Sequence, residues 1–173
     1  TVEKNVMYSD KFGMLDYSSN LKLRNYEVNK HINLLVNDFK WKSKKWLNST
    51  GVESYFQGLI KNVNYDADNT NEYKNEDNNH EIHSALGYLA KLNLFKEDLI
   101  NNNLQSLTPK FLLRYAPGHM RNASSAQNKL NYGNLFKLNK VNELDVLEPG
   151  LSTSVGFEYK KNKLDNKNIT SDE

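Results

Sequence analysis

The sequence predicts an all-β protein in which antiparallel strands form part of a large transmembrane β-barrel with long polar loops. Apolar and polar residues alternate with a period of two along several long segments, which indicates two-faced strands. The chain holds 27 asparagines, which favour turns and weaken helix interiors. Because no apolar run approaches the ~20 residues of a transmembrane helix, any membrane crossing would have to use strands.

Composition narrows the functional classes. The 173 residues carry a net charge of +2, from 23 basic and 21 acidic residues, so we expect no nucleic acid among the partners. There is no cysteine, which excludes disulfides and thiolate metal sites. The mean hydropathy is −0.79, yet 10 Tyr, 7 Phe and 2 Trp indicate an ordered chain with much polar surface. The chain begins at Thr1 without an initiator Met, as expected for a piece of a longer protein.

Six segments are expected to form strands, and each has about ten residues or more: 14–26, 30–43, 46–63, 82–95, 107–116 and 150–161. Strands of soluble sheets are usually ~5 to 6 residues long, whereas tilted strands that cross a bilayer need about 9 to 11. Six strands are fewer than the minimum of about eight in a closed membrane barrel. Strand length and pattern therefore leave two architectures open for residues 1–173: a partial β-barrel domain, and a soluble β-sandwich or large sheet.

Two of these segments are less regular than the others. In 30–43 the apolar residues change parity, from Ile32, Leu34 and Val36 to Phe39 and Trp41, which predicts a bulge or a change of face near Asn37. Segment 46–63 is expected to be one strand with an apolar face opposite a polar one; the apolar face holds Trp46, Val52, Phe56 and Ile60, and the polar face holds Glu53, Gln57 and Lys61.

Alternation also assigns candidate residues to the two sides of the expected barrel wall, with lipid outside and water inside. The candidate lumen-facing residues are Lys91, Arg114, Ser152, Ser154 and Glu158. The candidate lipid-facing residues are Phe111, Leu113, Leu151, Val155, Phe157 and Tyr159. Arginine at Val155 or Phe157 should cost ~2 to 4 kcal/mol near the membrane midplane, and arginine at Ser154 should cost far less.

Two long loops are expected, at 64–81 and 116–149. The first is nearly all Asn, Asp and Glu and has nothing to bury. The second retains apolar residues such as Leu135 and Phe136, so we expect it to fold back over the barrel mouth or lumen.

No group of residues indicates an enzyme. His80 and His83 would point to opposite faces of a strand, and the Asp- and Glu-rich stretch before His80 lacks the spacing of a calcium loop. Neither a nucleophile elbow nor a glycine-rich phosphate loop is present in the sequence. We therefore expect no catalytic residue, no metal site and no cofactor.

A more specific pattern spans residues 107–159. The stretches "LTPKFLLRYAPGHMRN" and "LNYGNLFKLNKVNELDVLEPGLSTSVGFEY" resemble the barrel domain of the LptD family, the lipopolysaccharide-assembly or organic solvent tolerance proteins. The matching residues are Leu107, Pro109, Tyr115, Pro117, Asn131, Leu135, Phe136, Asp145, Gly156 and Tyr159. Lys140, Glu143 and Val146 depart from the family pattern, which leaves any role of those positions open.

The resemblance implies an internal segment of a very large barrel in the cell outer membrane. Such a barrel belongs to the translocon that inserts lipopolysaccharide into the outer leaflet. The implied partners are lipopolysaccharide, outer-membrane lipid, the lipoprotein plug LptE and the periplasmic bridge proteins of the transport pathway. The low hydropathy and the Asn-rich loops leave a soluble all-β binding or adhesion module as the alternative function.

Overall fold

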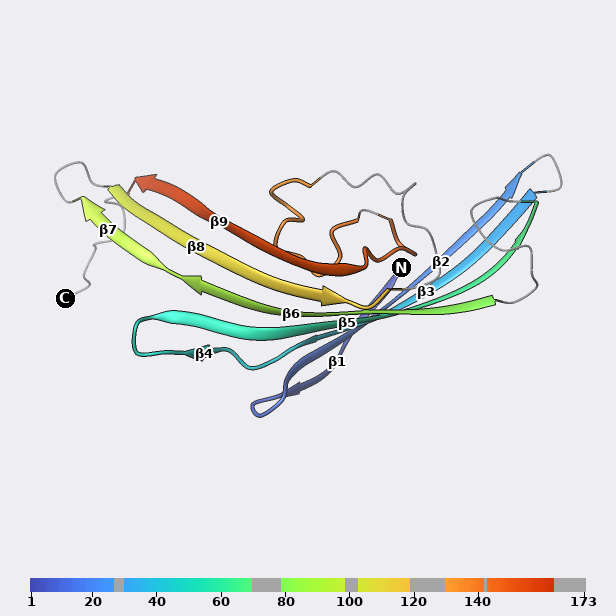
Figure 1. Cartoon of the computed structure of the whole chain (residues 1–173), viewed down its shortest axis with the longest axis horizontal. Coiled ribbons are helices and arrows are strands. Elements are labelled where there is room, and N and C mark those ends of the chain that lie inside the picture. Colours follow the sequence, from blue (N-terminus) through green and yellow to red (C-terminus); the bar gives the residue numbers. More distant parts are fainter. Residues whose placement is uncertain (27–29, 70–78, 99–102, 119–129, 142, 164–173) are drawn as a thin grey trace, which may run out of the picture.

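The computed structural model describes residues 1–26, 30–69, 79–98, 103–118, 130–141 and 143–163. The described residues form one curved antiparallel sheet and contain no helix (Figure 1). The strands are β1 (Val2–Ser9), β2 (Gly13–Tyr26), β3 (Lys30–Lys42), β4 (Trp46–Leu47), β5 (Val52–Asp68), β6 (Asn79–Leu92), β7 (Leu94–Asp98), β8 (Asn103–Ala116) and β9 (Gly150–Lys163). The predicted all-β antiparallel class is confirmed.

The nine strands follow a simple up-and-down meander. Strands β3 and β4 pair in turn with β5, and β6 and β7 pair in turn with β8. The register of β7 continues that of β6, because Lys91 lies opposite Lys110 and Leu94 lies opposite Leu107. Strands β1 and β9 stand at the two ends of the pairing order, so the described sheet is open.

The connections differ between the two ends of the sheet. At one end, residues 10–12, 48–51 and 99–102 join β1 to β2, β4 to β5 and β7 to β8. At the other end, residues 27–29, 69–78 and 117–149 make the connections. Residues 27–29 are as few as residues 10–12, but the other two connections at the second end are longer than any at the first. We therefore call the two ends the short-turn end and the long-loop end.

The prediction of one strand over 46–63 is wrong, because a turn at residues 48–51 separates β4 from β5. The side-chain Oδ1 of Asn48 accepts hydrogen bonds from the backbone N–H groups of Thr50 and Val52, at 3.0 and 2.9 Å. Gly51 follows with a φ of 82°, a left-handed conformation that glycine adopts without steric cost. Local side-chain bonding of this kind outweighs the weak alternation across the segment.

Other expected boundaries also shift. The loop predicted at 64–81 is shorter, since β5 continues to Asp68 and β6 starts at Asn79. The buried side chains of Tyr65 and Ala67 hold this part of β5 in the sheet despite its polar sequence. Strand β8 begins at Asn103 rather than 107, the segment predicted at 82–95 divides into β6 and β7, and strand β1 was not predicted.

The change of parity in 30–43 is a change of face within a continuous strand. Strand β3 pairs in unbroken register with β2 and with β5. Ile32, Leu34 and Val36 therefore point to one face of the sheet, where they are buried, and Phe39 and Trp41 point to the other. The alternative prediction of a bulge near Asn37 is wrong.

Residues 130–149, apart from residue 142, lie in the concavity of the sheet (Figure 1). Leu138 and Leu147 are buried there in a cluster with Leu59, Ala85 and Ala116. The side of the sheet that this segment contacts is called the covered face, and the opposite side the open face. The part of the chain described contains no helix long and apolar enough to cross a membrane.

Candidate functional site

The strand register places the two predicted sets of residues on opposite faces of the sheet. Leu112 pairs with Leu89 and with Ser154, so these residues share the covered face, and neighbours two residues along each strand join them. The residues predicted to face the lumen lie on this face: Lys91, Arg114, Ser152, Ser154 and Glu158. The residues predicted to face lipid lie on the open face: Phe111, Leu113, Leu151, Val155, Phe157 and Tyr159.

Arg114 on β8 fixes the segment to the covered face. Its side chain is 1% exposed. The Nε–H group donates to the backbone carbonyl of Leu138 at 2.5 Å, and a terminal N–H donates to the carbonyl of Glu148. Both acceptors belong to the segment, so one guanidinium joins the sheet to the middle of the segment and to a residue near its end. Bonds from a charged donor are stronger than neutral ones.

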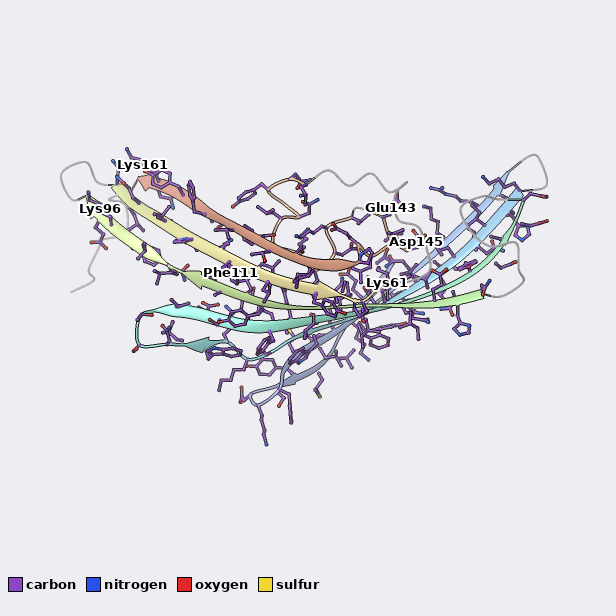
Figure 2. The ribbon with its side chains drawn as sticks, viewed as in Figure 1. Lys61, Lys96, Phe111, Glu143, Asp145 and Lys161 are labelled. Atoms are coloured by element: carbon purple, nitrogen blue, oxygen red, sulfur yellow. The ribbon has the colours of Figure 1, made fainter. Side chains whose placement is uncertain are left out.

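Lys61 on β5 makes a second attachment. Its ammonium is 2.7 Å from the carboxylate of Asp38, its cross-strand neighbour on β3, and 2.5 Å from the backbone carbonyl of Leu144 in the segment. Figure 2 shows Lys61 on the sheet beside the segment that carries Glu143 and Asp145. The Lys61 side chain is 2% exposed, so these two partners take the place of the water that would otherwise solvate its ammonium.

Lys140 reaches in the opposite direction, from the segment to β9. Its ammonium donates to the hydroxyls of Ser152 and Ser154, at 3.1 and 3.2 Å. Burial lowers the pKa of Lys140 below the ordinary lysine value; the nearby Glu148 opposes this shift and Arg114 adds to it. The expectation that arginine at Ser154 would be mild is not supported, because Ser154 is buried against this cation.

Ion pairs continue along the covered face toward the short-turn end. Lys110 on β8 forms an ion pair with Glu158 on β9, and Glu158 also accepts a hydrogen bond from Tyr132 of the segment, which raises the pKa of that phenol. Glu53 on β5 is 3.5 Å from the ammonium of Lys91. Beside these pairs lies a polar cavity of about 280 Å³, lined in part by Lys91, Lys110 and Glu158.

Two glycines on the covered face make room for the segment. A Cβ at Gly87 would lie 2.7 Å from a methyl carbon of Leu138, and a Cβ at Gly156 would lie 3.2 Å from the ring of Phe136. The segment therefore contacts the backbone of β6 and β9 directly. Residues 130–149, without residue 142, do fold back onto the sheet, as expected for part of the predicted loop 116–149. That this segment covers a barrel mouth or lumen stays a prediction.

The open face carries exposed apolar side chains instead of buried charged ones. Large apolar side chains are exposed along it from β2 to β9; they include Leu21, Leu23, Phe39, Phe56, Ile60, Ile82, Leu86, Phe111, Leu113, Tyr115, Leu151, Val155, Phe157 and Tyr159. Val155 is the most exposed of these, at 73%. Trp46, Phe56 and Tyr88 form an aromatic cluster on it, with ring centroids 5.4 to 6.4 Å apart.

The exposed apolar residues form a band that crosses the strands obliquely. A cross-strand row joins Leu15, Trp41, Gly58, Leu86, Tyr115 and Leu151. On β2 the exposed apolar residues continue toward the long-loop end, beyond the polar Ser19, as far as Leu23. On β9 the band extends toward the short-turn end and stops between Tyr159 and Lys161. Successive strands therefore contribute different parts of their length to this band.

Asp38, Lys61, Lys110 and Lys140 were not named as candidate site residues from the sequence, although Lys61 was expected on the polar face of segment 46–63. A signal was present for Asp38, which shares the parity of Ile32, Leu34 and Val36. Its pairing with Lys61 depends on the register of β3 against β5, which the sequence does not reveal. Within the described residues, no group of three or more His, Cys, Asp or Glu side chains is placed to hold a metal ion.

The fold and its faces define a class: a curved antiparallel meander with many exposed apolar side chains on one side and buried charges under a folded-back segment on the other. No protein-family model matches the sequence, and a search of curated proteins finds no match.

Proposed function

We propose that this chain is a segment of a transmembrane β-barrel in the outer membrane, and that the barrel belongs to the lipopolysaccharide-assembly translocon of the LptD family. The observation that carries the membrane part of the proposal is the oblique apolar band of the open face. Soluble monomers rarely expose contiguous apolar patches above a few hundred Å². Here the band extends across six strands from β2 to β9.

The dimensions of the band suit a bilayer. On β8 its apolar residues run from Leu107 to Tyr115, which spans about 26 Å along a strand at ~3.3 Å per residue. A strand tilt of ~40° reduces this to about 20 Å along the membrane normal, close to the ~25 Å apolar band of outer-membrane barrels. Tilt also explains why the band is oblique to the strands.

The connections support one orientation. Outer-membrane barrels have short turns on the periplasmic side and longer loops outside. We assign the short-turn end, with residues 10–12, 48–51 and 99–102, to the periplasm. The long-loop end would then face the cell exterior, and residues 130–149 would enter the lumen from that side.

The lipopolysaccharide part of the proposal rests on the resemblance over 107–159. Its matching residues have structural roles in the segment: the Asn131 side chain accepts a hydrogen bond from the backbone of Gly133 at 2.8 Å, and Phe136 lies against Gly156. The resemblance therefore includes the segment that covers the polar face. In this reading the partners of the full-length protein are lipopolysaccharide, LptE and the periplasmic bridge proteins.

Fractionation of cells that express the full-length protein tests the membrane part. We expect the protein in the outer membrane, with faster gel migration before heating than after it, because folded barrels resist detergent. A soluble product with a single mobility would contradict the proposal and would favour the soluble all-β binding or adhesion module.

Conditional depletion tests the transport part. Loss of a translocon component should lower the amount of lipopolysaccharide labelled on intact cells while the total amount in lysates persists. Restoring the wild-type protein provides the control. Unchanged surface lipopolysaccharide would reject this role and leave the barrel assignment in place.

A further inference from the structure

A groove lies within the apolar band of the open face. It has a volume of about 370 Å³ and is lined by residues of five strands, from β2 to β8, among them Trp41 on β3 and Tyr115 on β8. Its lining also includes Leu15, Phe39, Gly58, Ile60, Ser84, Leu86 and Pro117. The described residues that line it include no charged side chain.

The absence of a side chain at Gly58 creates part of the groove. A Cβ at this position would lie 3.3 Å from the indole ring of Trp41. Ser84, which pairs with Ile60, adds a second small residue to the floor. Larger neighbours in the same rows, Phe39 and Leu86, stand on either side.

One wall of the groove is held in place. The indole N–H of Trp41 donates to the backbone carbonyl of Phe12 at 2.9 Å, in the turn that joins β1 to β2. This bond satisfies the polar atom of the indole and fixes the orientation of the ring. The groove therefore has a preformed aromatic side rather than one that must be organised on binding.

We infer that the groove binds one hydrocarbon chain of a membrane lipid. This inference rests on the proposed function, because only the bilayer would bring lipid to the open face. The groove is continuous with the apolar band, and its lining is uncharged, which suits an acyl chain. Tyr115 and Pro117 lie where β8 ends, so the chain enters from the long-loop border of the band and runs toward Phe39 and Trp41.

The two tryptophans of the chain provide the test. Trp41 lines the groove, and Trp46 belongs to the aromatic cluster outside it. The full-length protein, with its other tryptophans replaced by phenylalanine, is placed in vesicles of phosphatidylcholine brominated along the acyl chain. Bromine quenches indole fluorescence on contact. In Trp46→Phe and Trp41→Phe variants, we expect the remaining Trp41 or Trp46 to be quenched.

Filling the groove separates the inference from the proposed function. Ser84→Leu places an apolar side chain in the groove and should remove most of the quenching of Trp41 while that of Trp46 persists. The matched control is Thr153→Leu, the same kind of change on the open face of β9, outside the groove.

The outcomes are distinct. If neither tryptophan is quenched, the proposed membrane function fails together with the inference. If Trp46 is quenched and Trp41 is not, or if Ser84→Leu leaves the quenching of Trp41 unchanged, the membrane assignment stands and the acyl-chain site is rejected.

Discussion

Strand β8 meets two different environments on its two sides. On the covered face, Leu112 and Arg114 are buried at 0% and 1% exposure, and the arginine binds backbone carbonyls of the segment. On the open face, Leu113 and Tyr115 are 41% and 56% exposed. In a water-soluble sheet the charged residue would be outside and the large apolar residues inside. The comparison shows that β8 carries its buried charge on the covered face and its large apolar side chains on the open face, which is the arrangement that the proposed membrane barrel requires.

The strongest test of the covered face is the buried pair of Asp38 and Lys61. Asp38→Ala leaves the Lys61 ammonium buried beside one carbonyl, and we expect a loss of ~3 to 5 kcal/mol in the free energy of unfolding. Urea titration of the protein in lipid vesicles measures it. The pair of Lys45 and Glu53 is the control, since Lys45 is half exposed and Lys45→Ala should cost ~1 kcal/mol or less.

A double variant sharpens this result. Asp38→Ala combined with Lys61→Met removes both charges, and most of the lost stability should return. If Asp38→Ala lowered the free energy of unfolding no more than Lys45→Ala, water would reach Lys61 on the covered face despite its burial.

Arginine substitutions on β8 compare the two faces directly. Phe111→Arg puts a charge in the apolar band and should cost ~2 to 4 kcal/mol in a bilayer. Thr108→Arg points to the covered face, where Glu158 is its cross-strand neighbour, and should be much milder. The measurement is the same urea titration in vesicles. Equal losses at both positions would break the assignment of the faces.

The attachment of the segment depends on Arg114. Arg114→Met keeps the length of the side chain but removes the donors to Leu138 and Glu148, which should cost about 1 to 3 kcal/mol. Limited proteolysis followed by mass spectrometry should then show faster cleavage within residues 130–149. Arg114→Lys, which retains a donor, should restore part of the protection. A cleavage rate equal to wild type would show that apolar contacts alone hold the segment.

The smallest expected effect concerns the glycine beneath the segment. Gly156→Ala brings a methyl group 3.2 Å from Phe136 and should cost about 1 kcal/mol by displacing the ring. Gly118→Ala is the control, because a Cβ there meets nothing within 4 Å. The difference in urea midpoint between the two variants reports the contact. Equal midpoints would mean that Phe136 moves away from the added methyl group without loss of stability.

Periodicity located most of the sheet because the alternation of side chains is a local property of an extended chain. Periodicity gave wrong strand boundaries at two places. The Asn48 side chain accepts hydrogen bonds that form a turn inside an expected strand. Asn64 and Asp66 belong to β5, although they were expected in a loop, because their neighbours Tyr65 and Ala67 are buried. Strand β1 was missed because its residues are mostly exposed and show little contrast between faces.

The sequence by itself determined the all-β class, the open-face residues of β8 and β9 and the fold-back of an apolar segment, since each depends on a pattern within a short stretch. Only the tertiary structure decided which distant residues meet. Strand register and the position of the segment on the sheet determine these contacts. They bring Lys61 to Asp38 and Leu144, and Arg114 to Leu138 and Glu148. Register also forms the groove over Gly58. Register is a sum of many pairings along whole strands, and a local pattern does not specify it.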